Sequence, residues 1–209
     1  KLINTAIAID SGKVKLEEKF NTTKPLKYGR HRIDDFRYLD KPVNVAEILV
    51  NSSNIGSALI AERIGPKTQK HYFDLLELTK KPNLPLLEVS KPIFNRKWPK
   101  LTSITASYGY GIAVSPIQLA SAISCIFNDG KFIAPRLIKN KNEIIEKTVF
   151  SKKTSLTMRK LARAVVTHPD GSGKKADAYG YLVGGKTGTA EIISNTGGFK
   201  KNANLSSFV

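Results

Sequence analysis

The sequence contains very little cysteine and histidine, and it has no long hydrophobic run. One cysteine among 209 residues excludes an intramolecular disulfide framework. No apolar stretch approaches the roughly 20 residues that span a bilayer. His31, His71 and His168 stand alone, without the spacing that metal ligands show, so we expect neither a metal nor a cofactor.

Acidic residues are also scarce, since 17 Asp and Glu face 34 Lys and Arg and leave a net charge of +17. Such a charge suits a nucleic-acid or anionic-surface partner. The lysines are scattered, however, and no arginine-rich helix or aromatic-interleaved basic stripe stands out, so no nucleic-acid partner is expected. A hydrophobic content of 41% is ordinary for a globular domain, and a chain of this length can bury one sizeable core.

Apolar periodicity and helix-capping residues predict several helices. These cover residues 1–10, 43–51, 54–64, 66–78, 115–128 and 151–167. Extended segments are predicted at 132–139 and 143–150, as a hairpin, and at 179–193. Residues 12–41 are expected to be irregular with short extended pieces, and the proline-rich 80–102 to be loop. Cys125 lies on the apolar side of its helix and is expected to be a buried thiol.

The run Gly184-Gly185-Lys186-Thr187-Gly188-Thr189-Ala190 fits two unrelated chemistries. Residues 180–187 match the P-loop pattern G-x-x-x-x-G-K-T, whereas Lys186–Thr189 spell K-T-G-T, a motif of serine enzymes that penicillin acylates. A P-loop needs a buried strand before the loop and a long helix at the lysine. The sequence predicts a strand through Lys186 and another turn at 197–198, which disfavours a P-loop.

A second short motif supports the K-T-G-T interpretation. Asn51-Ser52-Ser53-Asn54 contains S-x-N at the junction of two predicted helices, where polar side chains can face a cleft. Taken alone, this triplet is an ordinary helix cap. Its position ahead of Lys186 is what gives it weight.

Together these motifs resemble those of the class B penicillin-binding proteins, and within them the peptidoglycan D,D-transpeptidases of cell division. The stretch 106–120, which contains Tyr108-Gly109-Tyr110-Gly111, is similar to the family's aromatic-glycine turn and following helix. The resemblance covers essentially all of residues 1–209. It implies an α/β (α+β) fold of the penicillin-binding-protein and serine β-lactamase type, with an antiparallel central sheet flanked by helices.

The family's nucleophile motif, S-x-x-K, has no match before Ser52. The tetrad that begins at Ser172 comes too late and lies in a polar turn, so we interpret it as a chance match. Residues 1–12 resemble the helix that follows the motif lysine in the family, which makes Lys1 that lysine. We therefore expect residues 1–209 to be a partial transpeptidase domain, incomplete at both ends, with the nucleophilic serine three positions before Lys1.

The resemblance implies a role for each motif residue. Lys1 would be the base, Ser52 a proton relay, Asn54 a positioning group, and Lys186 a cation that depresses the pKa of Lys1 and attracts the substrate carboxylate. Substrate contacts fall to Thr187, Gly188, Thr189 and Ala190, with the Thr189 N–H in the oxyanion hole. Strict strand alternation would turn Lys186 and Thr187 to opposite faces, which leaves the part of Thr187 least defined.

The resemblance also implies partners and a location. Expected ligands are peptidoglycan stem peptides ending in D-Ala-D-Ala, β-lactams as inhibitors, and membrane proteins of cell division, at the periplasmic face of the bacterial inner membrane. Two alternatives stay open within the same fold: a serine β-lactamase, and a catalytically silent penicillin-binding or sensory domain. A P-loop NTPase is a remote third.

Overall fold

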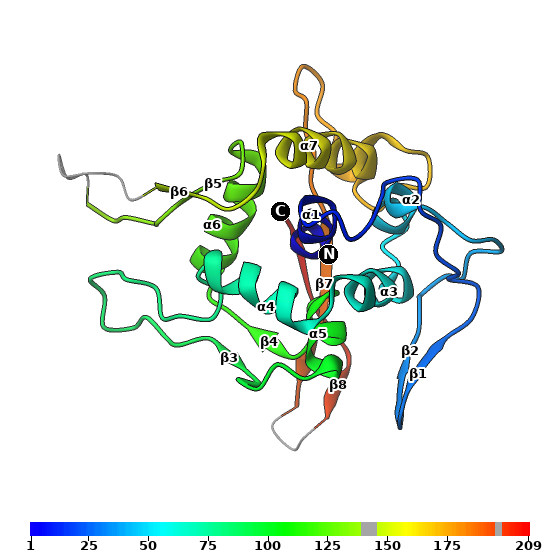
Figure 1. The fold of residues 1–209 in the computed structure, drawn as a ribbon, viewed down its shortest axis with the longest axis horizontal. Coiled ribbons are helices and arrows are strands. Elements are labelled where there is room, and N and C mark those ends of the chain that lie inside the picture. Colours follow the sequence, from blue (N-terminus) through cyan, green and yellow to red (C-terminus); the bar gives the residue numbers. More distant parts are fainter. Residues whose placement is uncertain (139–145, 195–197) are drawn as a thin grey trace.

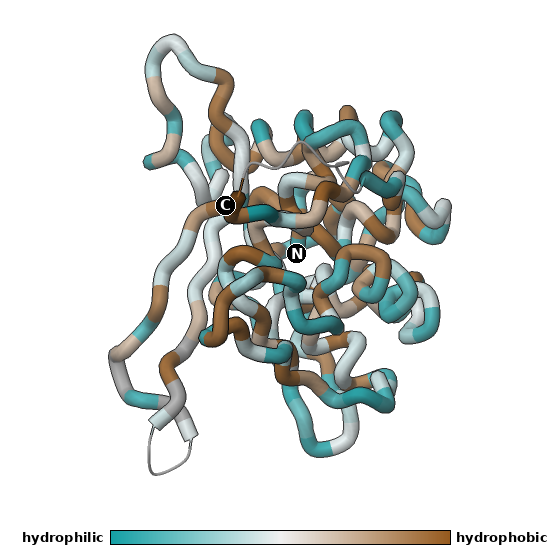
Figure 2. The backbone as a smooth tube through the Cα atoms, turned by 90° about the vertical axis from the view of Figure 1, so that its left-hand side faces the viewer, coloured by the Kyte–Doolittle hydropathy of each residue, from teal (hydrophilic) through white to brown (hydrophobic). Residues whose placement is uncertain are grey.

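The computed structural model describes residues 1–138, 146–194 and 198–209. Helices form one body of the molecule, and a long hairpin runs along one side of it (Figures 1 and 2). The helices are α1 Leu2–Asp10, α2 Val45–Val50, α3 Asn54–Ile64, α4 Pro66–Leu75, α5 Lys100–Ala106, α6 Pro116–Phe127, α7 Lys152–Thr167 and the short 3-10 helix η1 Lys174–Ala176. Within the described ranges, no helix is long and apolar enough to cross a membrane.

The described strands pair as antiparallel couples, β1 with β2, β3 with β4, β5 with β6 and β7 with β8. Their bounds are β1 Leu26–Tyr28, β2 His31–Ile33, β3 Ile93–Phe94, β4 Ile112–Ala113, β5 Lys131–Ile133, β6 Glu146–Thr148, β7 Thr187–Ile193 and β8 Phe199–Phe208. The β7–β8 pair is the long one, with Thr187 opposite Phe208 and Ala190 opposite Leu205. Figure 2 shows the helical body on one face of this pair.

Helix α1 lies at the centre of the helical body, against α3, α4, α6 and α7 (Figure 1). Leu2, Ala6, Ile7 and Ala8 are buried, as expected for a helix that is apolar on nearly every face. Since the core holds α1 from several sides, the helix start is held inside the molecule. That start carries Lys1, which the sequence analysis assigned to the active site.

A buried polar network fixes α1 further. The Gln69 Nε2 donates to Asn4 Oδ1 at 3.0 Å and to the Ser103 carbonyl at 2.9 Å, and Trp98 Nε1 donates to Gln69 Oε1 at 3.0 Å. All four residues are buried, and each of these groups has a partner, as a buried amide requires. The network therefore ties α1 to α4 and α5 in one register.

Cys125 is buried in α6, as its position on the apolar side of the helix predicted. Its Sγ contacts the Gly130 carbonyl at 3.4 Å, and burial raises the pKa of the thiol to about 12. The thiol is therefore protonated at neutral pH and fills space in the core.

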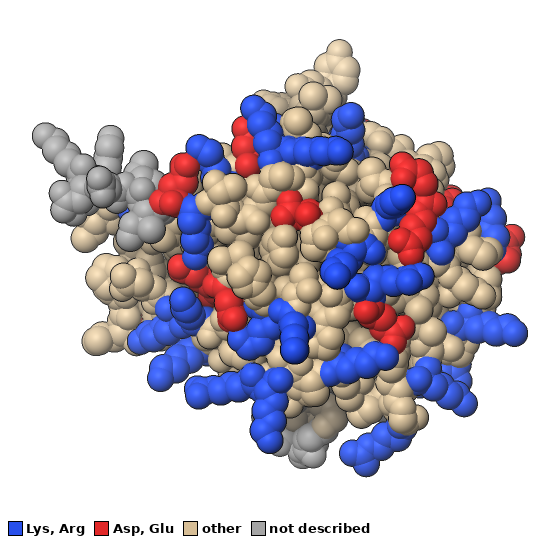
Figure 3. All heavy atoms as spheres, in the orientation of Figure 1, with Lys and Arg blue, Asp and Glu red and all other residues tan. Residues whose placement is uncertain are grey.

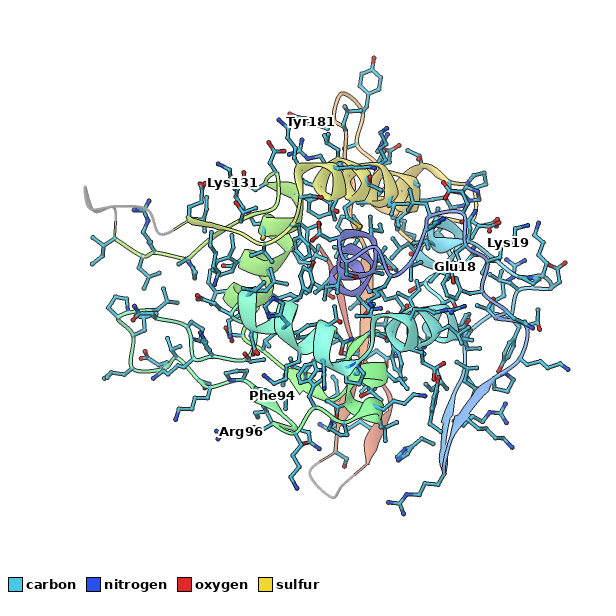
Figure 4. The ribbon with its side chains drawn as sticks, in the orientation of Figure 1. Glu18, Lys19, Phe94, Arg96, Lys131 and Tyr181 are labelled. Atoms are coloured by element: carbon cyan, nitrogen blue, oxygen red, sulfur yellow. The ribbon has the colours of Figure 1, made fainter. Side chains whose placement is uncertain are left out.

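The predicted helices agree with the observed ones to within a few residues, but two segments differ. The proline-rich 80–102 was predicted as loop throughout, yet it contains β3 and the first turn of α5. The strand predicted over 179–193 begins only at Thr187, since Gly180 lies in a turn with a φ of 83° and the Gly185 N–H donates to the Ala162 carbonyl of α7 at 3.1 Å instead of to a strand. Tyr181 there points away from the body, 74% exposed (Figure 4).

The predicted hairpin of 132–139 and 143–150 is present but shorter. Its strands pair over Lys131–Ile133 and Glu146–Thr148. Residues 134–138 and 149–150, also predicted to be extended, lie in no strand, and residues 139–145 lie outside the described residues.

Candidate active site

The S-x-N motif lies at the turn between α2 and α3, and its first serine has an unusual backbone. Ser52 N–H donates to the Leu49 carbonyl at 3.1 Å and Ser53 N–H to the Ile48 carbonyl at 3.0 Å, which is a Schellman ending for α2. This ending puts Ser52 at a φ of 57°, in the left-handed region where glycine is usual. A serine there costs ~1–2 kcal/mol, and such strain concentrates at functional sites.

The next two residues, Ser53 and Asn54, have different roles at the junction. Ser53 is buried and caps α3, since its Oγ accepts from Gly56 N–H at 2.8 Å. Asn54 starts α3, and its Oδ1 accepts from Lys1 Nζ at 2.7 Å. Helix capping therefore accounts for Ser53 alone, while the side chains of Ser52 and Asn54 are directed to other partners.

Lys186 brings the second motif to the same place. Its side chain is 4% exposed, and its Nζ donates to Ser52 Oγ at 2.9 Å, Ser172 Oγ at 3.1 Å and Thr187 Oγ1 at 3.0 Å. Lys186 precedes β7 but extends the pairing with Val209, through bonds of 2.8 and 3.2 Å between their backbones. The two motifs, far apart in the sequence, thus lie within hydrogen-bond distance of each other.

The two lysines are strongly perturbed. Burial lowers the pKa of Lys1 to about 8, against the opposing pull of the Asp35 carboxylate. Burial, followed by the positive charge of Lys1, lowers the pKa of Lys186 to about 7. The repulsion was expected to act on Lys1, but here Lys186 is the residue with the lower pKa. Near pH 7 to 8 the pair can therefore supply both a neutral amine and an ammonium.

The strand residues after Lys186 occupy different surroundings. Thr187 Oγ1 lies beside Lys186 Nζ rather than on an opposite face, because Lys186 is outside the regular strand and its long side chain reaches back. Gly188 is crowded, since a Cβ there would lie 2.5 Å from Ser207 Oγ. Thr189 and Ala190 are exposed. Thr187 thus joins the lysine cluster, while Thr189 and Ala190 form an open surface.

Ser172 is a site residue that the sequence analysis did not identify. As an S-x-x-K motif its tetrad fails, because Lys175 is exposed on the 3-10 helix and Lys174 Nζ donates to the Pro169 carbonyl. The Ser172 hydroxyl nevertheless lies within 3.1 Å of both Lys186 Nζ and Thr187 Oγ1. Only the fold brings this turn to Lys186, and no local sequence pattern signals it.

Two other chemistries lack their structural requirements here. The chain continues from Lys186 into β7, so the helix that a P-loop places after its lysine is replaced by a strand. Within the described ranges, no three His, Cys, Asp or Glu side chains come together as metal ligands would.

Comparison with known proteins identifies the family of this chain. The family model of the penicillin-binding protein transpeptidase domain matches residues 1–209, and the chain belongs to that family. A probable peptidoglycan D,D-transpeptidase FtsI of Caulobacter vibrioides is 37% identical over 195 residues, covering 91% of this chain and 33% of that protein. The FtsI of Buchnera aphidicola subsp. Baizongia pistaciae is 32% identical over 196 residues, covering 88% of this chain and 33% of that protein.

Solved structures show the same fold. The apo transpeptidase domain of Burkholderia pseudomallei penicillin-binding protein 3 superposes with a TM-score of 0.89 at 26% identity, covering all of this chain and 63% of that one. Penicillin-binding protein 3 of Mycobacterium tuberculosis, complexed with aztreonam, gives 0.91 at 23% identity, covering 99% of this chain and 50% of that one. The chain spans about a third of the length of these two curated relatives.

Proposed function

We propose that these 209 residues form most of the active site of a serine-type peptidoglycan D,D-transpeptidase. One observation carries the proposal: Lys186 Nζ lies 2.9 Å from Ser52 Oγ, while Lys1 Nζ lies 2.7 Å from Asn54 Oδ1. Three segments far apart in the sequence thus place two amines of lowered pKa, a hydroxyl and an amide in one cluster. The nucleophile in this proposal is a serine three positions before Lys1 in the full-length protein.

In the acylation step, neutral Lys1 takes the proton of the nucleophilic serine, whose oxygen attacks the carbonyl of the penultimate D-alanine. The C–N bond to the terminal D-alanine breaks, and that amine leaves with a proton relayed through Ser52. Asn54 holds Lys1 in place by the hydrogen bond already described. An acceptor amine then attacks the ester, which forms the cross-link and frees the serine.

In this proposal, substrate binding determines which of the two lysines is protonated. The terminal carboxylate of the stem peptide binds beside Lys186 and Thr187, and a negative charge there raises the pKa of Lys186. Lys186 then carries the ammonium, and its charge favours the neutral form of Lys1. The low pKa of free Lys186 is therefore compatible with its role as a counter-ion in the complex.

The face and free edge of β7 offer a peptide backbone a place to bind. Within the described part of the chain, β7 pairs only with β8, and Thr189 and Ala190 are exposed. An extended D-Ala-D-Ala terminus can add along such an edge through its backbone groups. The Thr189 N–H, with that of the nucleophilic serine, would stabilise the oxyanion. β-Lactams would acylate the same serine.

The relatives that are named FtsI support a role in cell division for the full-length protein. In this proposal it acts at the periplasmic face of the bacterial inner membrane and meets division proteins of that membrane. The basic side chains do not contradict this, because they are dispersed and interspersed with acidic ones on the face that Figure 3 shows.

Fluorescent penicillin tests the proposal. The full-length protein should bind one equivalent covalently and release it slowly, because a transpeptidase shields its acyl-enzyme from water until an amine arrives. Replacing the serine three positions before Lys1 by alanine should abolish labelling. The 209-residue chain alone should not label.

Each other outcome points to a different function. Rapid release of the adduct would indicate a β-lactamase. An intact serine without labelling would indicate a silent binding domain. Labelling of the 209-residue chain through Ser172 would show that the nucleophile has been misassigned.

A further inference from the structure

Asp35 connects a loop near the start of the chain to the S-x-N motif. It lies two residues after β2, and its Oδ1 accepts from the backbone N–H groups of Asn54 at 2.5 Å and Ile55 at 3.0 Å. Its Oδ2 accepts from Ser53 Oγ at 2.5 Å. One carboxylate therefore satisfies two free N–H groups at the start of α3 and the hydroxyl of its cap, where the helix dipole also favours a negative charge.

The same loop sets the orientation of the Asn54 amide. Asn54 Nδ2 donates to the Asp34 carbonyl at 3.1 Å. A carbonyl can accept only from the NH2 end of the amide, so Oδ1 is turned toward Lys1 Nζ. Asp35 fixes the backbone of Asn54 while Asp34 fixes its side chain.

Asp35 also acts on Lys1 through its charge. Its negative charge raises the pKa of Lys1 and so offsets part of the effect of burial. The positive charges of Lys1 and Lys186, in contrast, repel each other. Asp35 is thus the negative charge that acts on Lys1.

We propose that Asp35 is a positioning residue of the active site, which holds Asn54 and through it Lys1 in the geometry required for acylation. The inference builds on the transpeptidase function proposed above. It goes beyond the motifs, since residues 34–35 were expected to be part of an irregular segment and carry no sequence signal of a role.

The test compares Asp35→Asn, Asp35→Ala and Asp40→Asn in the full-length protein. Asp40→Asn is the matched control, because it makes the same change of charge five residues away, at an exposed side chain of the same segment. The second-order rate constant of acylation by fluorescent penicillin is measured from pH 6 to pH 10. Asp35→Ala should lower it about 100-fold, the cost of a misplaced catalytic group.

Asp35→Asn should lower the rate less, since its amide oxygen can still accept from the two N–H groups. The rise of its acylation rate constant with pH should occur at lower pH than in the wild type, because removing the carboxylate lowers the pKa of Lys1. Asp40→Asn should keep both the rate constant and the pH dependence of the wild type. Equal behaviour of the Asp35 and Asp40 variants would overturn the inference.

A second readout separates this inference from the function itself. Trace acetylation of the Lys1 amine, followed by mass spectrometry over the same pH range, reports the protonation of Lys1 without any acylation of the serine. The midpoint of Lys1 acetylation should fall in Asp35→Asn and not in Asp40→Asn, even if the wild type failed to bind penicillin and the proposed function were lost. An unmoved midpoint, or loss of cooperative unfolding in Asp35→Asn, would reduce Asp35 to a structural helix cap and overturn the inference.

Discussion

The α2–α3 junction and the β7–β8 hairpin each supply half of the candidate site, but they are built in opposite ways. Around the junction, Ile48, Leu49, Ile55 and Ala58 are fully buried, so the core holds Ser52 and Asn54 from below. In the hairpin, Thr189 and Ala190 are exposed and Leu205 is 66% exposed. The junction is therefore rigid by packing, while the hairpin offers an accessible surface.

This contrast indicates that the two halves of the site have different roles. Groups that must be held to a fraction of an ångström, the relay and the positioning amide, lie on the packed side. Groups that must meet a peptide lie on the open side. Lys186 belongs to the hairpin segment but is buried at the junction, so it is the residue that couples the two halves.

The largest effect should come from breaking that coupling. Lys186→Ala in the full-length protein removes the carboxylate counter-charge and the hydrogen bond to Ser52 together, and penicillin acylation should fall on the order of 10³-fold. Lys175→Ala is the control, since it removes an exposed lysine from the neighbouring turn and should leave the rate unchanged. A loss of less than tenfold in Lys186→Ala would show that the two halves work independently.

The next test uses the strained backbone of the junction. Ser52→Gly should raise the free energy of unfolding by about 0.5–1 kcal/mol, because glycine adopts the left-handed conformation without the serine penalty, although it adds freedom to the unfolded chain. Acylation should fall about 100-fold, the usual range for loss of an acid–base group. Denaturant unfolding and penicillin labelling measure the two effects.

Ser52→Ala separates them. It removes the hydroxyl but keeps the Cβ, so it should lose the same activity without the gain in stability. If both variants had the stability of the wild type, the left-handed backbone of Ser52 would carry no strain. The geometry of the junction would then cost the protein no stability.

The contrast between the halves also explains what the sequence could predict. Ser52 and Asn54 follow a periodic helix and precede another, so motif and local structure support each other. The strand at Lys186 was predicted too long, because Tyr181, Leu182 and Val183 resemble a buried strand although the first two are exposed. A short apolar run does not say whether a core will cover it.

The contributions of Asp35 and Ser172 could not be predicted at all. Asp35 lies 19 residues before the backbone N–H group of Asn54 that it binds, and Ser172 lies 14 residues before Lys186. Both sit in polar segments, where a side chain that orients a catalytic group has the same composition as one that is merely solvated. Only tertiary structure distinguishes the two.

A smaller effect should come from the hydroxyls around Lys186. Thr187→Ala and Ser172→Ala each remove one acceptor of its ammonium, and each should slow acylation about tenfold, the equivalent of one hydrogen bond of ~1.4 kcal/mol. Thr187→Ser keeps the hydroxyl and should restore nearly the full rate. If Thr187→Ala lost as much as Lys186→Ala, the threonine would contribute a contact to the ligand beyond its bond to the lysine.

The smallest effect should be on stability as a function of pH. Lys186 has a folded pKa of about 7 and an unfolded value near 10.5, so between these pH values the unfolded chain binds more protons. The free energy of unfolding must then rise with pH in that window. Lys186→Met lacks this titrating amine but keeps every other one. Between pH 7 and pH 9 the free energy of unfolding of the wild type should therefore rise by about 1 kcal/mol more than that of the variant, a value that allows for a change in the pKa of Lys1 when Lys186 is removed. Chemical denaturation of both proteins at pH 7, 8 and 9 measures this shift. If the stability difference between the two proteins stayed constant with pH, Lys186 would keep an ordinary pKa despite its burial. The hairpin segment would then add no electrostatic repulsion at the junction.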